Sequence, residues 1–322
     1  MSRRLILDTD LDTDCDDAGA LAIIHALMDR GECELLGVIC SVSVPACVGA
    51  ARAINAGYGR EAIPVGLVEV PEYATSPTWQ PYRQHHASFL RPTANADPYN
   101  VLLANTRPGN DPPAEQAVAL YRRLLASAPD TSVTICAIGT LTALAQLLAS
   151  PADLHSPLSG LDLVRKKVRE LISMAVLPFP AGQEAFNWRM DAPSAAAVLQ
   201  TWPTALTISP SGNSVLTGAR FTQIAPADHP VREAYVSYLG GVGRDRPSWD
   251  LIAALYAVRG MAGPFARSTS RHLQFDSQTA HYQWGTLADT SLPPRRLILP
   301  LLPDAELATL LEDLMIVSLA GL

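Results

Sequence analysis

A dense run of acidic side chains lies near the start of the chain. Six of the ten residues from Asp8 to Asp17 are aspartates. Carboxylates this close repel one another strongly unless a cation lies among them. Hard cations such as Ca²⁺ and Mg²⁺ prefer oxygen ligands of this kind. The run therefore predicts a metal site. The plainer interpretation is a solvated acidic turn, in which Asp16 and Asp17 favour the dipole of a following helix.

The residues on either side of the run predict how it is held. Residues 5–7 are apolar and typical of a short buried strand, and residues 18–28 are almost continuously apolar. The second pattern is typical of a helix that is buried on most of its faces. A strand followed by a helix places the aspartates at the carboxyl edge of an open α/β sheet, which is where ligands bind.

The same alternation continues along the chain. Further strands are expected at 35–40, 63–67, 133–138, 170–176 and 205–208, and further helices at 46–56, 114–128, 141–149, 192–200 and 248–258. This spacing predicts an α/β fold with an open, mostly parallel sheet and helices on both faces. We expect one domain over residues 1–322, with a hairpin within 271–284 and an amphipathic helix within 301–322. Proline-rich residues 69–112 predict a long irregular segment, which is typical of a lid or a disordered excursion.

Composition limits the classes of protein to consider. The chain has 322 residues, of which 48% are hydrophobic and 17% charged, so it can bury a large core. Its formal net charge of −7 argues against nonspecific binding to nucleic acid. The five cysteines are odd in number and form no C-x-x-C motif, so a reducing compartment is expected. No stretch predicts a signal peptide or a membrane span, and we expect a cytoplasmic protein.

Two families of enzymes place acidic motifs after a first strand. A phosphotransferase of the haloacid-dehalogenase type needs D-x-D-x-T/V, but the fifth position is Asp12 when counted from Asp8 and Asp14 when counted from Asp10. The order D-T-D…D-D-A, present here as 8–10 and 16–18, resembles the opening of the inosine-uridine-preferring nucleoside hydrolase family. The spacer is two residues longer than in the commonest form of that family.

Further segments resemble landmarks of that family in the expected order. They are 52–60 before Ile63-Pro64-Val65-Gly66, then Ile138-Gly139-Thr140-Leu141-Thr142, Phe186-Asn187-Trp188-Arg189-Met190-Asp191 and Ser248-Trp249-Asp250. The resemblance implies Ca²⁺-dependent hydrolysis of the N-glycosidic bond of a ribonucleoside or related riboside to base and ribose. It implies a small-molecule partner, and it is consistent with a homo-oligomer.

The resemblance also implies roles for particular residues. Asp10, Asp17 and Asp250 would bind Ca²⁺ through their side chains, and Ile138 through its carbonyl oxygen. Asp10 would also be the catalytic general base, because a carboxylate beside a cation stays ionised at neutral pH. In the substrate-binding set, Asp16 would hold a ribose hydroxyl and Asn187 the 5′ side of the sugar, while Trp249 could stack on the base.

The chain departs from the family at several positions. Trp249 stands where many members have a histidine that protonates the leaving base, and His85 and His86 are possible replacements. The family's glutamate falls at Ala185, with Glu184 one place earlier, so one sugar contact is in doubt.

The long acidic spacer leaves the register of the first motif open. Counting forward from the strand makes Asp10 the base, whereas counting back from the second motif makes it Asp12. We prefer Asp10 and expect Asp12 to be an exposed turn residue, with the role of Asp14 open. Trp188 could line the pocket or pack under the sheet. These departures motivate an alternative function, a non-catalytic or repurposed ribosyl-binding protein that keeps the metal site.

Overall fold

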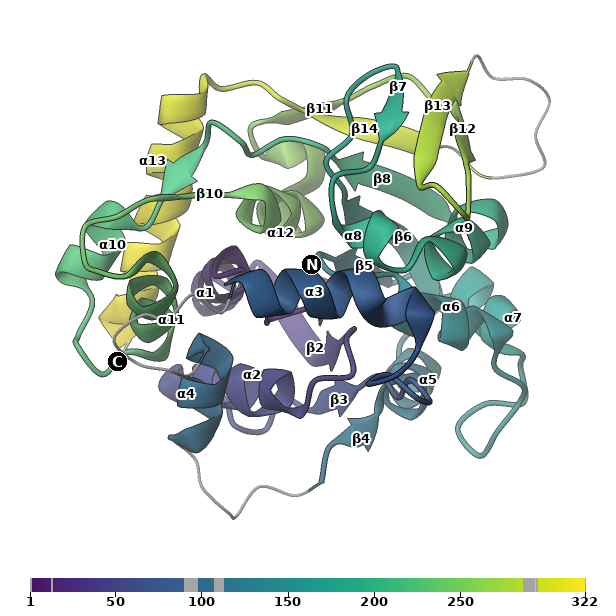
Figure 1. The fold of residues 1–322 in the computed structure, drawn as a ribbon, viewed down its shortest axis with the longest axis horizontal. Helices are drawn as coiled ribbons and strands as arrows, with labels where there is room; N and C mark the ends of the chain where they lie inside the picture. The colour runs from purple at the N-terminus through teal and green to yellow at the C-terminus, as the bar shows by residue number, and fades with distance from the viewer. Residues whose placement is uncertain are drawn as a thin grey trace.

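The computed structural model describes residues 2–12, 14–89, 98–106, 113–285, 293 and 295–321. Its centre is a nine-stranded sheet in the order β11-β14-β8-β6-β5-β1-β2-β3-β4 (Figure 1). All neighbouring strands are parallel except β11, which is antiparallel to β14. The strands are β1 Arg3–Thr9, β2 Cys33–Cys40, β3 Val65–Leu67, β4 Glu115–Gln116, β5 Val133–Ala137, β6 Val168–Met174, β8 Ala205–Ser209, β11 Phe265–Arg267 and β14 Arg295–Pro300. The predicted open, mostly parallel sheet is confirmed.

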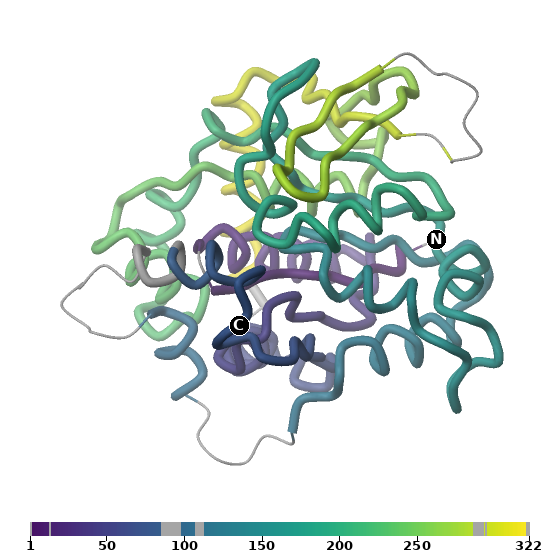
Figure 2. The backbone as a smooth tube through the Cα atoms, turned by 45° about the vertical axis from the view of Figure 1, so that its right-hand side comes forward, coloured from purple at the N-terminus to yellow at the C-terminus, as the bar shows by residue number. Residues whose placement is uncertain are grey.

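Helices cover both faces of this sheet because side chains alternate along each strand. In β1, Leu5 and Leu7 belong to one buried apolar cluster and Ile6 to the other. The first cluster includes α1 Asp16–Asp29, α2 Pro45–Gly57, α11 Pro230–Leu239, α12 Trp249–Arg259 and α13 Asp304–Val317. The second includes α5 Ala117–Ser127, α6 Thr142–Ala149, α7 Gly160–Lys167 and α9 Ala192–Thr201. In Figure 2 the purple N-terminal strand and helix run through the middle of the molecule.

Smaller elements lie around this framework. A three-stranded antiparallel sheet has the order β12-β13-β7, and its β12–β13 pair is the predicted hairpin. A two-stranded sheet joins β9 and β10. The elements are β7 Ala181–Gln183, α8 Asn187–Met190, β9 Leu216–Thr217, α10 Ala219–Ile224, β10 Arg246–Pro247, β12 His272–Phe275 and β13 His281–Gly285. Short 3-10 helices span Gly260–Ala262 and Ser318–Gly321.

The expectation of a long irregular segment at 69–112 is wrong for the part that is described. It contains a 3-10 helix at Pro77–Trp79, then α3 Gln80–Phe89 and α4 Tyr99–Asn105. Pro77 and Pro81 lie in the first turns of two of these helices and Pro98 directly before the third, where the missing N–H costs nothing, so these three prolines mark helix beginnings. Trp79, Tyr82 and Tyr99 are buried and fix the segment against the core. Residues 90–97 and 107–112 lie outside the described residues.

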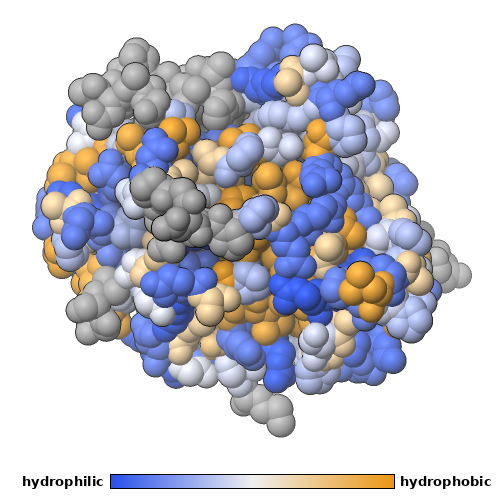
Figure 3. All heavy atoms as spheres, turned by 90° about the horizontal axis from the view of Figure 1, so that it is seen from below, coloured by the Kyte–Doolittle hydropathy of each residue, from blue (hydrophilic) through white to orange (hydrophobic). Residues whose placement is uncertain are grey.

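The C-terminal helix is amphipathic, as expected from the sequence, and much of the surface seen in one view is hydrophilic. Hydrophilic residues cover much of the face in Figure 3, with hydrophobic residues between them. α13 buries Leu307, Leu311 and Leu314 on one side, as an amphipathic helix does. Throughout the described ranges, no helix combines the length and apolar character that a membrane span requires.

Candidate active site

A cavity of about 210 Å³ opens at the carboxyl ends of the central strands β1, β5 and β6. This is the edge where an open α/β sheet binds ligands. The seven residues to which the resemblance gives catalytic, metal or substrate roles all line it, namely Asp10, Asp16, Asp17, Ile138, Asn187, Trp249 and Asp250. Residues far apart in the sequence thus meet at the edge that the strand-then-aspartate pattern predicts.

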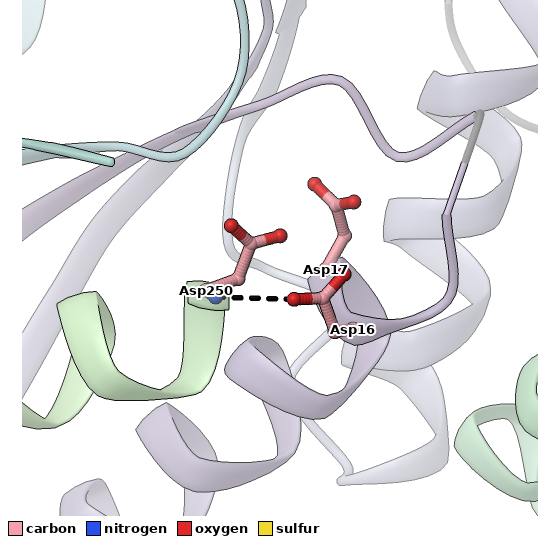
Figure 4. Close-up of side chains that lie close together, drawn as sticks. All are labelled: Asp16, Asp17 and Asp250. Atoms are coloured by element: carbon pink, nitrogen blue, oxygen red, sulfur yellow. Dashed lines mark hydrogen bonds between the residues drawn. The ribbon is translucent and has the colours of Figure 1, made fainter. Parts of the chain in front are cut away.

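Three carboxylates from two helices form the most acidic corner of the cavity. Asp16 and Asp17 begin α1, and Asp250 is the second residue of α12, which packs against α1. The three residues each offer one carboxylate oxygen within 4.8 Å of the others, and all three are buried (Figure 4). The backbone N–H of Asp250 donates a hydrogen bond of 3.1 Å to Asp16, which fixes one helix start against the other. Asp10 lines the same cavity but is not among these three.

The electrostatics of this corner call for a positive charge. Burial raises the pKa of the Asp10, Asp16, Asp17 and Asp250 carboxyls, and their mutual repulsion adds to the effect. Oδ2 of Asp10 and Oδ1 of Asp250 are buried and accept no hydrogen bond from the described residues. A hard divalent cation would satisfy these oxygens and offset the repulsion, so the donor set fits such an ion.

Asp10 owes its position to the tight approach of two strand ends. The Ile138 N–H donates to the Asp8 carbonyl oxygen at 2.7 Å, which joins the end of β5 to that of β1. The next residue is Gly139, and a Cβ there would lie 2.6 Å from the backbone nitrogen of Asp10. A glycine is therefore required for this approach. The Ile138 carbonyl oxygen accepts a 2.8 Å hydrogen bond from Nδ2 of Asn187 and keeps a second lone pair.

The other aspartates of the acidic run have separate partners. The expectation that Asp12 is exposed is wrong, because its side chain is 4% exposed. It accepts hydrogen bonds from Tyr82 of α3 (3.2 Å) and Asn100 of α4 (2.6 Å), the two helices that cover this turn. Asp8 accepts a 2.6 Å hydrogen bond from Tyr121 of α5. The structure thus places Asp10 in the cavity and Asp12 outside its lining.

Asp14 is paired with an arginine that the sequence did not single out. Nε of Arg246 lies 2.9 Å and 3.0 Å from the two carboxylate oxygens of Asp14, and both residues line the cavity. The guanidinium also lies over the rings of Tyr238 and Trp249, at 5.4 Å and 5.2 Å from their centroids. The only signal for Arg246 was its place just before the Ser-Trp-Asp motif. Lone arginines in such positions are common, so the sequence alone could not assign it a role.

Trp249 is held as a fixed wall of the cavity. Its indole Nε1 donates a 2.6 Å hydrogen bond to Oδ1 of Asn213, and Arg246 lies over its ring. Gly212 has φ +150°, and a Cβ there would lie 2.6 Å from Cα of Trp249. A larger residue at 212 would therefore displace Trp249, which has a ring face and no acidic proton to offer a ligand.

Glu184 turns away from the cavity. Its carboxylate is 1% exposed and accepts hydrogen bonds from four backbone N–H groups, those of Val176, Phe186, Trp188 and Arg189. Burial raises the pKa of Glu184 to about 7, against the opposing effect of these donors. Ala185 lines the cavity in its place. The sugar contact placed in doubt by the sequence is not made by Glu184.

Neither Trp188 nor a described histidine lines the cavity. Trp188 is fully buried in the core on one face of the sheet, where Nε1 donates a 3.0 Å hydrogen bond to Ser173. His85 and His86 lie in α3, but their side chains lie outside the described residues. The described lining of the cavity therefore holds carboxylates and arginines but no imidazole.

An open parallel α/β sheet with a buried carboxylate cluster at its carboxyl edge defines a class of ligand-binding α/β proteins. The family model for inosine-uridine preferring nucleoside hydrolase matches residues 5–291. The chain belongs to this family. A search of curated protein sequences returned no match.

Solved structures show the same fold at low sequence identity. The purine-preferring ribonucleoside hydrolase from Gardnerella vaginalis is 17% identical, with a TM-score of 0.67 and coverage of 99% of both chains. The inosine-uridine preferring nucleoside hydrolase from Bacillus anthracis is 16% identical, with a TM-score of 0.64 and coverage of 98% of this chain and 100% of that one. The type III effector protein XopQ, complexed with adenosine diphosphate ribose, is 15% identical, with a TM-score of 0.70 and coverage of 99% and 95%. The fold thus occurs in hydrolases and in an effector.

Proposed function

We propose that this protein hydrolyses the N-glycosidic bond of a ribonucleoside or related riboside, with the help of Ca²⁺, to release the base and ribose. The observation that supports this most is the meeting of Asp10, Asp16, Asp17 and Asp250 in one buried cavity at the sheet edge. Membership of the nucleoside hydrolase family supports the same class of reaction.

The proposed metal ligands are the carboxylates of Asp10, Asp17 and Asp250 and the carbonyl oxygen of Ile138. These are all oxygen donors, and an all-oxygen set of this size suits Ca²⁺. Asp16 lies close enough to Asp17 and Asp250 to share the ion or to bind a hydroxyl beside it. When bound, the ion supplies Lewis acidity for water and a point of attachment for the hydroxyls of the sugar.

Asp10, Asp16 and Asn187 have separate roles in the proposed reaction. Asp10 accepts a proton from the attacking water through Oδ2, the oxygen that has no described hydrogen-bond donor. The water oxygen bonds to C1′, and the electrons of the C1′–N bond leave with the base. Asp16 and Asn187 hold the sugar, so that C1′ stays in line with the water.

Trp249 could bind a base at the position where many family members have a histidine. Its ring offers a face for stacking, but it cannot protonate a leaving base. We therefore expect ribosides with activated leaving groups to react faster than natural nucleosides. The test is release of sugar from p-nitrophenyl riboside and from a panel of nucleosides, with Ca²⁺ and with a chelator. Ca²⁺-dependent release supports the proposal, and no release from protein that binds Ca²⁺ overturns it.

A second candidate function is ribosyl binding without hydrolysis. Two observations favour it: Glu184 faces the backbone instead of the cavity, and no imidazole is found among the described lining residues. XopQ, which shares the fold, is complexed with adenosine diphosphate ribose. Binding of a riboside that is recovered intact after long incubation would select this function over the first.

We also propose a cytoplasmic location. All five cysteines are buried as free thiols, which supports a reducing compartment. Burial raises the pKa of the Cys15 thiol, and the nearby Asp14 and Asp16 raise it further, so Cys15 stays protonated and is no nucleophile.

The expectation of a homo-oligomer stays a prediction.

A further inference from the structure

The cavity has three kinds of lining, and a riboside has three parts to match them. The carboxylate corner suits the sugar diol and the reacting C1′, through the proposed cation. Trp249, from α12, suits the flat base. A third wall is formed by Ala185, Phe186, Asn187 and Arg189, at and just before α8. This wall is left to face the third part of the substrate, the 5′ carbon of the ribose.

The two arginines that line the cavity differ in whether a described carboxylate pairs with their charge. Arg246 is paired with the carboxylate of Asp14 and lies over two aromatic rings. Arg189 makes no ion pair with a described residue, and its Nη2 donates to the Ala185 carbonyl oxygen at 2.6 Å. Its positive charge is therefore not offset by an acidic side chain of the described chain. Of the two arginines, Arg189 is therefore the one whose charge is available to bind an anionic ligand.

The same wall lacks a negative charge that could repel an anion. Ala185, whose side chain is an uncharged methyl group, lines the cavity here. The neighbouring Glu184 is 1% exposed, and its carboxylate accepts four backbone N–H groups. An anion beside Arg189 therefore meets a cation and a small side chain, and none of the four lining residues of this wall is acidic.

Arg189 also lines a second cavity, of about 540 Å³, next to the first. Its other polar lining side chains are uncharged, and they include Gln84, Gln183, Gln278 and Thr279. Arg189 is the only charged residue among the described lining of this second cavity. A group attached to the 5′ carbon would pass Arg189 and enter a space that contains amide and hydroxyl donors and no carboxylate.

We propose that the preferred substrate of this site is a riboside with a phosphate group on its 5′ carbon, and that Arg189 binds this phosphate. A guanidinium matches the oxygens of a phosphate with two parallel hydrogen bonds. The inference rests on the proposed hydrolysis and names the substrate class for it. It also explains why the wall at 184–185 has no carboxylate facing the cavity.

The test compares p-nitrophenyl riboside with its 5-phosphate at the same Ca²⁺ concentration. The readout is the ratio of kcat/KM for the phosphate ester to kcat/KM for the parent compound. We expect a ratio of about ten or more for the wild-type protein, and a fall of about tenfold in Arg189→Ala, because a hydrogen-bonded charge pair is lost. Arg189→Lys keeps the charge and should fall less. Ala185→Glu adds a carboxylate to the wall and should lower the ratio as well.

Arg165→Ala is the matched control, since Arg165 is an exposed arginine of α7 that pairs with Asp162. Its ratio should equal that of the wild-type protein. Hydrolysis of the parent compound with a ratio of one or less overturns the inference and leaves the proposed function standing. If neither compound is hydrolysed, the proposed function fails, and calorimetry with ribose 5-phosphate decides the inference. Binding about tenfold tighter in wild-type protein than in Arg189→Ala supports it, and equal binding overturns it.

Discussion

Asp10 occupies the junction between the first strand and the acidic run, and its carboxylate has a buried oxygen without a described donor. We expect Asp10→Asn to lower kcat by about 10²- to 10⁴-fold, because general base catalysis is worth that much and an amide cannot accept the proton. The measurement is kcat on p-nitrophenyl riboside, whose leaving group needs no proton. Asp12→Asn is the control, since Asp12 lies outside the lining of the cavity. Equal losses in the two variants would contradict the choice of Asp10.

His229 gives a test of how burial of a single side chain affects acid stability. It is 4% exposed, its ring nitrogens have no described hydrogen-bond partner, and burial lowers its pKa to about 4 although the nearby Asp228 opposes the shift. The unfolded chain binds a proton near pH 6.5, whereas the folded chain does not until about pH 4. The contribution to stability is therefore full above pH 6.5 and is lost as the pH falls toward 4.

We predict that His229→Phe removes this pH dependence. Between pH 7.5 and pH 5, the free energy of unfolding of the wild-type protein should fall by about 2 kcal/mol more than that of the variant. Urea unfolding at the two pH values measures the difference. His281→Phe is the control, because His281 is exposed on β13. Equal pH dependence in wild type and His229→Phe would show that His229 takes no part in acid destabilisation.

At the scale of elements, hydrogen bonds to the carboxylate of Glu184 hold the loop between β7 and α8. Glu184 accepts four backbone N–H groups from a stretch that has few other ways to satisfy them. Glu184→Ala should lower the free energy of unfolding by about 3 kcal/mol, because it leaves buried donors unpaired. Glu184→Gln keeps one oxygen as an acceptor and should cost less. Thermal unfolding of the three proteins measures the order, and an alanine variant as stable as wild type would contradict it.

The elements themselves were the most predictable part of the protein. Apolar runs of strand length, separated by helical patterns, predicted most of the central sheet because burial on both faces leaves a strong hydrophobic signal. The prediction for 69–112 was wrong in the described part, since Pro77, Pro81 and Pro98 lie at the starts of helices. Helices α10 and α11 were also missed, because their polar faces and short length weaken the pattern.

At the scale of the whole molecule, the site depends on contacts across almost the entire chain. The backbone N–H of Asp250 donates a hydrogen bond to Asp16, which lies 234 residues away in the sequence. Family resemblance supplied Asp250, because spacing alone cannot relate such distant residues. Arg189 and Arg246 were missed for a related reason. Their proposed roles depend on which carboxylates lie beside them in space. The sequence does not show that Arg246 pairs with Asp14, whereas Arg189 makes no ion pair with a described residue.

The packing of α1 against α12 also couples the proposed metal site to global stability. Asp17 and Asp250 come from the two helix starts and are buried together, so without a cation their repulsion opposes the contact. We predict that Ca²⁺ at about 100 times its Kd stabilises the fold by about 2.7 kcal/mol and raises Tm by about 4 °C. Differential scanning calorimetry with Ca²⁺ and with a chelator measures this.

Asp250→Asn separates the two effects in the same experiment. The variant removes one buried charge, so its Tm in chelator should exceed that of the wild-type protein, while its response to Ca²⁺ should largely disappear. Asp162→Asn is the control, since Asp162 lies in an exposed ion pair on α7 and should leave the Ca²⁺ response unchanged. An equal rise of Tm with Ca²⁺ in Asp250→Asn and wild type would place the cation elsewhere. Asp250→Asn should therefore have the higher Tm in chelator and the lower Tm with Ca²⁺. This reversal would indicate that the two helix starts hold the ion, because loss of a structural contact alone would lower Tm under both conditions.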